Sequence, residues 1–192
     1  MQKRAEETQR RILESATELF AAKGIKGATT DAIAEMAQVN KQRIYAYFNS
    51  KNGLFEKVLL NVFESVELFS EKMLEEAEAH PDQLTRLVLD DFLRVHGAHP
   101  VLWRLLAWAN LEGARCTEAL NMARKKENDR LRAVYQATHG DRGVSFEIWL
   151  FTLLAVSCFR YSNELTLVHT LGWNPADPVF EARMLDELGK LF

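Results

Sequence analysis

The sequence predicts an all-α protein with about nine helices, and three observations support this fold class. Apolar residues recur at intervals of three and four along almost all of the 192 residues, which is the period of a helix with one buried face. No stretch of useful length alternates between apolar and polar residues, as a half-buried strand would. The four prolines and nine glycines are few for this length and form no linker-like segment, so a disordered chain is excluded.

The first 50 residues are expected to form three helices. One apolar face predicts a helix over residues 6–23, and Gly24 follows it as a terminating glycine. Thr29 and Thr30 can cap a second, short helix over residues 30–37, and Asn40 can cap a third over residues 40–47. Only residues 38–40 join the last two helices. They cannot lie antiparallel across so short a connection, so the pattern predicts a helix-turn-helix.

Six longer helices are predicted in the remainder, over residues 51–79, 81–97, 100–110, 114–138, 144–171 and 179–191. Pro81 and Pro100 each suit the first turn of a helix, where proline is favoured. The helix over residues 144–171 is apolar nearly all round, so we expect it to be covered on two sides. We therefore expect two domains, residues 1–50 and residues 51–192, connected by the helix over residues 51–79.

The charge is distributed unevenly along the chain. The net charge is −3 overall, which alone argues against a nucleic-acid binder. Residues 1–57 nevertheless carry a net charge of +3 and residues 58–192 one of −6. Basic character is therefore confined to the first third of the chain, where a surface that contacts phosphates could lie.

Sequence motifs argue against an enzyme, a metal site or a cofactor. The five histidines are scattered and form neither an HExxH motif nor the Glu-x-x-His pairs of di-iron helical bundles, and no glycine-rich phosphate loop occurs. Cys116 and Cys158 lack a partner at metal-ligand spacing, and we interpret them as reduced core thiols. The longest apolar run is far short of the roughly 20 residues that cross a bilayer. The charged N-terminus is unlike a secretory signal, so we expect a cytoplasmic protein with no membrane partner.

The N-terminal pattern resembles the DNA-binding domain of the TetR family of bacterial transcriptional regulators. The resemblance covers residues 7–58 in one ungapped block, and the rest of the chain shares only helix number and lengths with the family. It is carried by Arg11-Ile12-Leu13, Ala16, Leu19-Phe20, Gly24, Thr29-Thr30, Ile33-Ala34, Ala37, Val39, Ile44-Tyr45, Tyr47-Phe48, Ser50-Lys51 and Leu54.

Two positions depart from the family pattern. Gln38 replaces the usual turn glycine, which predicts modest strain if this residue takes a positive φ. Gly53 replaces an acidic residue in the first turn of the helix that follows the third helix, which is expected to weaken the start of that helix.

The resemblance implies that this domain binds a double-stranded DNA operator, and the chemistry of its residues fits that role. Helix N-termini attract anions, so Thr29 and Thr30 are expected to hold a phosphate. In the third helix the apolar side chains face the domain core and leave Asn40, Lys41, Gln42 and Arg43 at the groove. Lys41 and Arg43 can donate to guanine, and Gln42 can pair with adenine. The resemblance assigns Tyr45, Tyr47 and Lys51 to the phosphate backbone, with partial core packing as the alternative for Tyr45.

One helix-turn-helix makes too few contacts for operator specificity, so we expect a homodimer that reads a palindromic operator. The helices over residues 144–171 and 179–191 are expected to form its four-helix interface, as in the family.

The resemblance also implies a pocket for an unknown small-molecule effector among the middle helices. Arg104, Asn110 and Glu112 are further polar candidates beside the expected lining residues, which are Phe63, Phe92, His96, Trp103, Trp108, Arg115, Tyr135, Trp149, Phe159 and Asn163. We expect a ligand-responsive repressor, which is the commoner role in the family. The alternative is a helical ligand- or protein-binding module that does not bind DNA.

Overall fold

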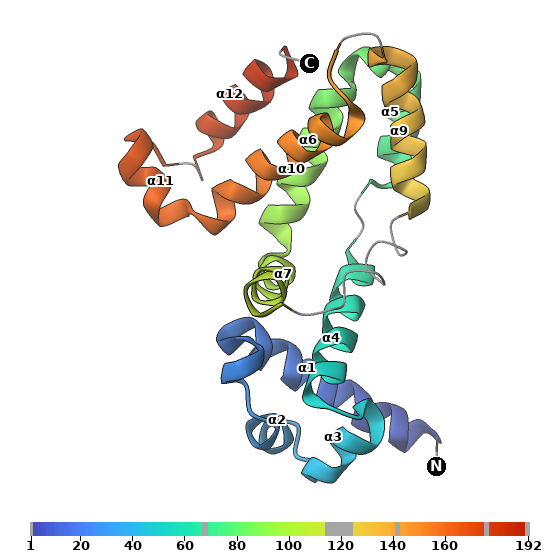
Figure 1. The fold of residues 1–192 in the computed structure, drawn as a ribbon, viewed down its shortest axis with the longest axis vertical. Coiled ribbons are helices and arrows are strands. Elements are labelled where there is room, and N and C mark those ends of the chain that lie inside the picture. The colour runs from blue at the N-terminus through green and yellow to red at the C-terminus, as the bar shows by residue number, and fades with distance from the viewer. Residues whose placement is uncertain (1, 67–68, 114–124, 141–142, 175–176, 191–192) are drawn as a thin grey trace. The chain divides into compact units, whose positions relative to one another are not determined.

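The computed structural model describes residues 2–66, 69–113, 125–140, 143–174 and 177–190, and every regular element in these residues is a helix (Figure 1). The all-α prediction is confirmed. The described residues form eleven α-helices and one 3-10 turn, η1. Their bounds are α1 Gln2–Gly27, α2 Thr30–Met36, α3 Lys41–Phe48, α4 Lys51–Ser65, α5 Glu71–Ala79, η1 Pro81–Gln83, α6 Leu84–Ala98, α7 Pro100–Glu112, α9 Lys125–His139, α10 Phe146–Ser162, α11 Glu164–Leu171 and α12 Pro178–Gly189.

The helices divide into two compact units. Unit 1 consists of residues 1–66 and 100–123, and unit 2 consists of residues 67–99 and 124–192. The chain therefore leaves unit 1 after α4 and returns to it for α7. Unit 1 is larger than residues 1–50, which we predicted as the DNA-binding domain, because α4 and α7 pack against α1.

Unit 1 has a continuous apolar core beneath the helix-turn-helix. Phe20 of α1 meets Phe55 of α4 edge to face, with ring centroids 5.2 Å apart. Ile33 of α2 and Ile44 of α3 are fully buried. Figure 1 shows α2 and α3 next to one another at the end of this unit, and both contact the longer helices. This core fixes how α2 and α3 cross.

Gly24 breaks α1 as the sequence predicted, and the helix resumes for one further turn. Its φ of 71° and ψ of 179° lie outside the helical region. A side chain at this position would also collide with α7, because a Cβ would lie 2.7 Å from Trp108 and from Glu112. Glycine is therefore required here by both conformation and space.

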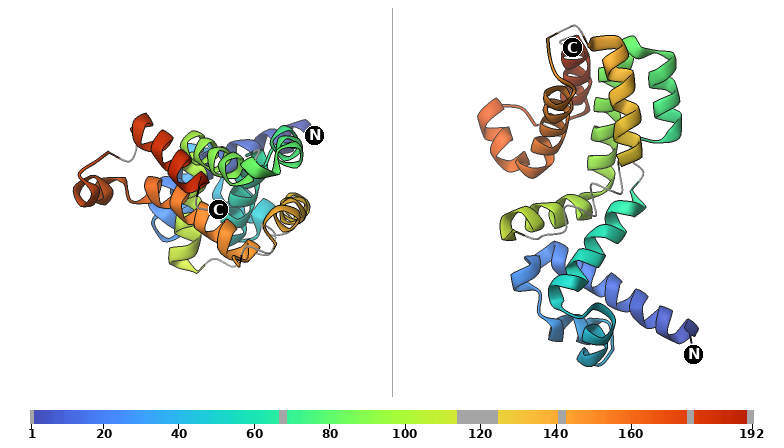
Figure 2. Two further views of the ribbon diagram at one scale, coloured as in Figure 1. Left: turned by 90° about the horizontal axis from the view of Figure 1, so that it is seen from above. Right: turned by 45° about the vertical axis from the view of Figure 1, so that its right-hand side comes forward.

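Unit 2 packs around α6 and α10, which lie side by side in both views of Figure 2. Trp149 of α10 has no exposed surface, and its Nε1 donates to Oγ1 of Thr85 at 3.0 Å. Tyr135 of α9 lies against Trp149, with ring centroids 4.7 Å apart. A buried apolar cluster surrounds these aromatic rings. These interactions anchor α9 and α10 on α6.

The helix predicted over residues 51–79 is two helices. α4 ends at Ser65, Phe69 has a φ of 56°, and Ser70 begins α5 by accepting a hydrogen bond from the amide of Met73 at 3.2 Å. The buried carboxylate of Asp91 accepts the amide hydrogen of Phe69 at 2.8 Å. The apolar period continues across the break, so the sequence pattern alone did not reveal it.

The helix predicted over residues 144–171 is also two helices, which brings nine predicted helices to eleven in the described residues. Asn163 interrupts it with a φ of −129° and a ψ of 22°, and its carbonyl oxygen accepts the amides of Thr166 and Leu167. The predicted helix over residues 114–138 is observed as α9 from Lys125, and its first part, residues 114–124, lies outside the described residues. None of the helices in the described ranges is both long enough and apolar enough to span a membrane.

Candidate nucleic-acid interface

The start of α2 is a well-formed helix N-terminus. Thr29 is exposed and extended, and its hydroxyl oxygen accepts the amide hydrogen of Ala32 at 3.1 Å. Thr30 is buried, and its hydroxyl lies 3.4 Å from that of Tyr45 in α3. Thr29 therefore caps the helix as predicted and remains accessible. Thr30 instead helps to hold α3 against α2.

The turn between α2 and α3 has the hydrogen-bond pattern of a Schellman motif. The amide of Gln38 donates to the carbonyl of Glu35 at 3.0 Å, and the amide of Val39 donates to the carbonyl of Ala34 at 2.9 Å. Gln38 takes a φ of 52°, in the left-handed region where glycine is favoured. The strain expected from a glutamine at this position is therefore present.

α3 presents its polar N-terminal half to solvent. Asn40 caps the helix by accepting the amide hydrogen of Gln42 at 2.9 Å, as predicted. Ile44 is fully buried in unit 1, whereas Gln42 and Arg43 are exposed. The predicted reading residues therefore lie together on one accessible end of α3.

Two of the three predicted reading residues already have intramolecular partners. Nζ of Lys41 lies 2.8 Å from Oδ2 of Asp31 in α2, and this hydrogen bond raises the pKa of Lys41. Nη1 of Arg43 lies 3.4 Å from Oγ1 of Thr8 in α1. Both contacts are at the surface or near it, so these cations can exchange partners at low cost.

The residues assigned to the phosphate backbone flank α3. Tyr45 is 44% exposed, which disfavours a role in core packing. Tyr47 is half-buried and lies edge to face on Phe48. Nζ of Lys51, in the first turn of α4, donates to the carbonyl oxygen of Ala28 at 3.2 Å. Lys51 therefore lies at the loop that precedes α2.

The structure explains why glycine occupies position 53, where the family usually has an acidic residue. Ser50 caps α4 by accepting the amide hydrogen of Gly53 at 2.9 Å. A Cβ at Gly53 would lie 2.4 Å from the carbonyl oxygen of Phe48. The close approach of α3 to α4 thus requires glycine at this position, and the expectation of a merely weakened helix start was incomplete.

The residues predicted to line a ligand pocket are divided between the units. Phe63, Trp103 and Trp108 belong to unit 1. Arg115 lies outside the described residues. The remaining six belong to unit 2, namely Phe92, His96, Tyr135, Trp149, Phe159 and Asn163. The structure assigns most of these side chains to other roles.

In unit 2, the buried members of this set pack in the core. Phe92 stacks on His96, with ring centroids 5.7 Å apart. Phe159 is 54% exposed on the outer face of α10. The side-chain Nδ2 of Asn163 donates to the carbonyl oxygen of Phe159 at 3.3 Å at the end of α10. Phe92 and His96 thus pack in the core, whereas Phe159 and Asn163 lie at the surface of α10 and at its end.

His96 and Cys158 form a buried contact between α6 and α10. Nε2 of His96 lies 3.6 Å from Sγ of Cys158. Burial lowers the pKa of His96 to about 4 and raises the pKa of the Cys158 thiol to about 12. Both groups are therefore neutral near pH 7. Within the described ranges no three His, Cys, Asp or Glu residues cluster closely enough to bind a metal ion.

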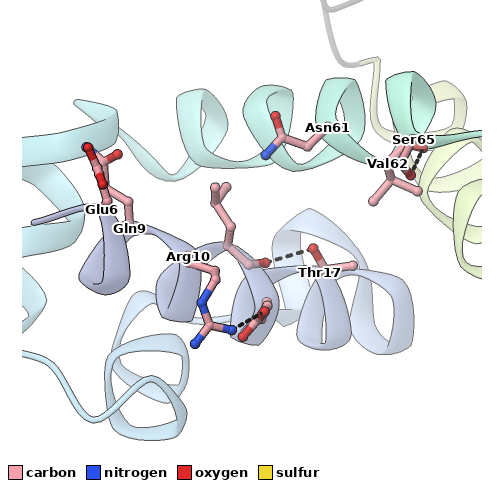
Figure 3. Close-up of a pocket in the computed structure, with 9 residues that line it drawn as sticks. Glu6, Gln9, Arg10, Thr17, Asn61, Val62 and Ser65 are labelled. Atoms are coloured by element: carbon pink, nitrogen blue, oxygen red, sulfur yellow. Dashed lines mark hydrogen bonds and ion pairs between the residues drawn. The ribbon is translucent and has the colours of Figure 1, made fainter. Parts of the chain in front are cut away.

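Two surface pockets of unit 1 are lined by side chains outside the predicted set, apart from Glu112. Figure 3 shows one between α1 and α4, lined by polar residues that include Glu6, Gln9 and Asn61. Arg10 at its edge forms ion pairs with Glu7 and Glu14, each at 2.6 Å. A second pocket in unit 1 is lined by Ile25, Lys26, Lys51, Asn52, Phe55, Glu56, Glu112 and Gly113. It lies beside the predicted phosphate-binding residue Lys51.

Sequence reasoning missed two polar residues that organise unit 1. Arg11 of α1 donates to the backbone of the turn at Ala37 and Gln38. Glu112, suggested above as a pocket residue, accepts the amide hydrogen of Lys26 at 3.1 Å. Both contacts join residues far apart in sequence, so helical periodicity carried no signal for them.

An exposed apolar face runs along the helices predicted to form a dimer. Phe151 of α10 is 67% exposed and Leu165 of α11 is 83% exposed. Further exposed apolar side chains on or next to α10, α11 and α12 are Ile148, Leu154, Phe159, Val168, Leu171, Trp173 and Val179. Large apolar side chains exposed in such number on three helices are typical of a protein interface.

Comparisons with known proteins agree with this geometry. The family model described as "Bacterial regulatory proteins, tetR family" matches residues 12–58. The HTH-type transcriptional repressor SCO4008 of Streptomyces coelicolor is 42% identical over 110 residues, which are 56% of this chain and 52% of that repressor. The chain thus spans about half the length of this relative.

Two further similarities extend over the whole chain. The HTH-type transcriptional repressor NicS of Pseudomonas putida is 27% identical over an alignment that covers 97% of this chain and 91% of NicS. The crystal structure of the transcriptional regulator SCO4942 of Streptomyces coelicolor matches with a TM-score of 0.70 and 25% identity, covering 96% of this chain and 98% of that one. The helix-turn-helix, the family match and the shared fold lead to one assignment. Through residues 12–58 this chain belongs to the TetR family of bacterial regulatory proteins, and its fold is that of a transcriptional regulator of known structure.

Proposed function

We propose that this regulator is a repressor that binds a palindromic DNA operator as a homodimer and releases it in response to a small molecule. The observation that carries DNA binding is the exposed N-terminal half of α3, where Lys41, Gln42 and Arg43 lie together above the buried Ile44. SCO4008 and NicS are both named repressors, which supports repression. A regulator of a bacterial chromosome would act in the cytoplasm.

The proposed DNA contacts fall into two groups. Gln42, Arg43 and Lys41 are assigned to base edges in the major groove, where guanine presents acceptors and adenine presents both an acceptor and a donor. The other assigned residues, Thr29, Thr30, Asn40, Tyr45, Tyr47 and Lys51, would position the domain on the phosphates. For Thr30 the contact would run through its backbone amide, because its side chain is buried against Tyr45.

The exposed apolar face of α10, α11 and α12 supports the proposed dimer. Side chains such as Phe151 and Leu165 would lose their contact with water against a second copy, and burial of apolar surface contributes about 25 cal/mol per Å². A two-fold axis through this face would give two reading helices and hence a palindromic target. The interface would use the first two of these helices, α10 and α11, where we predicted one continuous helix.

For the effector we propose only its chemical class, a small molecule. Its binding would change DNA affinity only to the extent that it prefers one conformation of the dimer over another. The predicted lining residues that are buried in the unit 2 core, such as Trp149 with no exposed surface, are less suited to direct contact than partly exposed ones such as Trp103.

The salt dependence of binding to a random-sequence DNA duplex tests DNA binding directly. Contacts with phosphates release counterions, so affinity should fall steeply and linearly on a log-log plot as salt rises. A control protein variant with Gln42 and Arg43 both changed to alanine should retain part of this non-specific binding and lose sequence preference. Salt-independent or undetectable binding at low salt would favour a binding module without DNA function.

Sedimentation equilibrium tests the dimer. A charge on the apolar face should be strongly unfavourable once that face is buried, so Phe151→Glu should shift the protein toward monomer at micromolar concentration. Gln136→Glu is the control, because it adds the same charge at an exposed position of α9, outside the proposed interface helices. A wild-type monomer, or an unaffected Phe151→Glu dimer, would contradict this interface.

A further inference from the structure

Helix α7 is joined to the end of α1 by two polar contacts within unit 1. Nε1 of Trp108 donates to the carbonyl oxygen of Ala21 at 3.4 Å, before the break at Gly24. Oε2 of Glu112 accepts the amide hydrogen of Lys26 at 3.1 Å, after the break. The two side chains therefore hold α1 on both sides of its kink.

The contact of Glu112 has the form of a helix cap supplied by another helix. The kink at Gly24 begins a new helical turn, and the first backbone bond within it runs from the amide of Ala28 to the carbonyl of Gly24 at 3.1 Å. Amide groups at the start of such a turn lack partners within the helix. A carboxylate there satisfies a donor and also interacts favourably with the helix dipole.

The capped turn leads directly into the proposed DNA contacts. Ala28 is its last residue before Thr29, which caps α2. Lys51 donates from Nζ to the carbonyl oxygen of Ala28 at 3.2 Å, so the same turn positions a second proposed phosphate contact. Glu112 and Lys51 also line one surface pocket.

We propose that Glu112 is a positioning residue for DNA binding, which caps the turn after Gly24 and so holds Thr29 and Lys51 where they can contact phosphates. This inference rests on the proposed DNA-binding function. α7 is thereby part of the DNA-binding unit, although more than 50 residues separate it in sequence from α3. Without the cap, the turn samples other conformations, and apparent affinity falls in proportion to the competent fraction.

Three variants distinguish a positioning role of Glu112 from the effect of its negative charge on DNA binding. Glu112→Met removes the acceptor, whereas Glu112→Gln keeps an oxygen that can accept the amide hydrogen of Lys26. Glu56→Met removes an exposed carboxylate from the same pocket. Affinity for a random-sequence duplex is measured at one salt concentration, with circular dichroism to establish that each full-length variant is folded. Exchange of the Lys26 amide hydrogen, followed by NMR, reports the cap itself.

We expect Glu112→Met to weaken DNA binding roughly threefold to tenfold, in line with the loss of one cap. Loss of a negative charge alone would strengthen binding to DNA, so the expected sign is opposite to that of a charge effect. Glu112→Gln should stay within about twofold of wild type, Glu56→Met should not weaken binding, and only Glu112→Met should exchange the Lys26 amide faster.

Two results would overturn this inference alone: wild-type affinity in Glu112→Met, or an equal loss in Glu112→Gln and Glu112→Met. If wild type itself showed no salt-dependent binding, the proposed function would fail and this inference with it. The two failures are thus distinguished by the behaviour of wild type.

Discussion

The guanidinium of Arg11 in α1 lies against Gln38 in the turn between α2 and α3. Its Nη2 is 3.3 Å from the backbone carbonyl oxygen of Gln38 and 3.3 Å from the side-chain Oε1. It also donates to the carbonyl oxygen of Ala37. A glycine, which is usual in the family, would relieve the backbone strain of the positive φ at this position. It would also remove the hydrogen bond between Arg11 and the side chain of Gln38. Arg11 therefore offsets part of the strain that the glutamine introduces.

This relationship predicts a specific coupling between two substitutions. Gln38→Gly should change the free energy of unfolding by less than about 1 kcal/mol in wild type, because relief of strain and loss of the hydrogen bond oppose one another. In an Arg11→Ala background the bond is already absent, so Gln38→Gly should stabilise by about 1 kcal/mol. Urea unfolding of the four proteins measures this. Equal effects in both backgrounds would show that the side-chain bond contributes nothing.

Lys51 should contribute equally to the affinity for every DNA sequence. Lys51→Ala is expected to weaken binding to all duplexes alike and to reduce the slope of log affinity against log salt by about 1. Lys57→Ala, which removes an exposed lysine from the same helix, is the control and should change the slope less. The assignment to a phosphate fails if the slope of Lys51→Ala equals that of wild type.

Arg43 should determine the base preference at one position of each operator half-site. If it reads guanine through both acceptors, Arg43→Ala costs about 1 to 3 kcal/mol at that position and relaxes the preference there. Thr8→Ala removes the intramolecular partner of Arg43 and should leave the preference intact. Binding to a set of single-base operator variants measures both. A uniform loss across all sequences would move Arg43 to the backbone contacts.

The ion pair of Lys41 with Asp31 should restrain DNA binding. Asp31→Asn frees Lys41 and removes a negative charge next to the reading surface, so affinity for any duplex should rise, on the order of twofold to tenfold at low salt. Glu35→Gln removes a charge from an exposed residue of the same helix and should have a smaller effect. Weaker binding by Asp31→Asn would mean that the pair instead orients Lys41 for its contact.

Protonation of His96 should destabilise the fold in mild acid. Its pKa of about 4 in the folded protein lies below the value of about 6.5 in an unfolded chain. The unfolded state therefore binds the proton first, and stability that is complete above pH 6.5 is lost as the pH falls toward 4. The expected loss between pH 7 and pH 5 is about 2 kcal/mol.

Urea unfolding of His96→Phe at these two pH values tests this prediction. The variant removes the titrating group and keeps a ring beside Phe92, so its stability should depend less on pH than that of wild type. His169→Gln, at an exposed histidine of α11, should retain the wild-type dependence. A His96→Phe profile parallel to wild type would assign the acid sensitivity to other groups.

The helix-turn-helix could be predicted from the sequence because it is determined by interactions between residues close together in the chain. Thr29 and Asn40 cap the helices that they were expected to cap, because a short polar side chain before an apolar pattern is itself the cap. Gly24 breaks α1 with a φ of 71°, a conformation that glycine adopts readily. In these cases the determining interaction lies within a few residues or depends on glycine alone.

Long-range contacts made the remainder unpredictable. The break after α4 is held by Asp91, 22 residues away from Phe69, and the cap on Lys26 comes from Glu112, 86 residues away. The apolar periodicity continues without interruption through residues 51–79 and therefore does not predict the break there. A periodic pattern likewise gives no information about a contact between residues as distant as Lys26 and Glu112. The aromatic residues expected to line a pocket shared composition and spacing with ordinary core residues, and Trp149 is one of those core residues.

Whether α3 reads DNA as one half of a dimer is best measured by selecting bound DNA from a random library with the purified protein, followed by sequencing. We expect a two-fold symmetric consensus whose half-sites lie about one helical turn, or a multiple of it, apart. Arg43→Ala should recover the same consensus with one degenerate position in each half-site. Recovery of no consensus, together with binding that is independent of salt, would contradict the assignment of α3 as a DNA-reading helix.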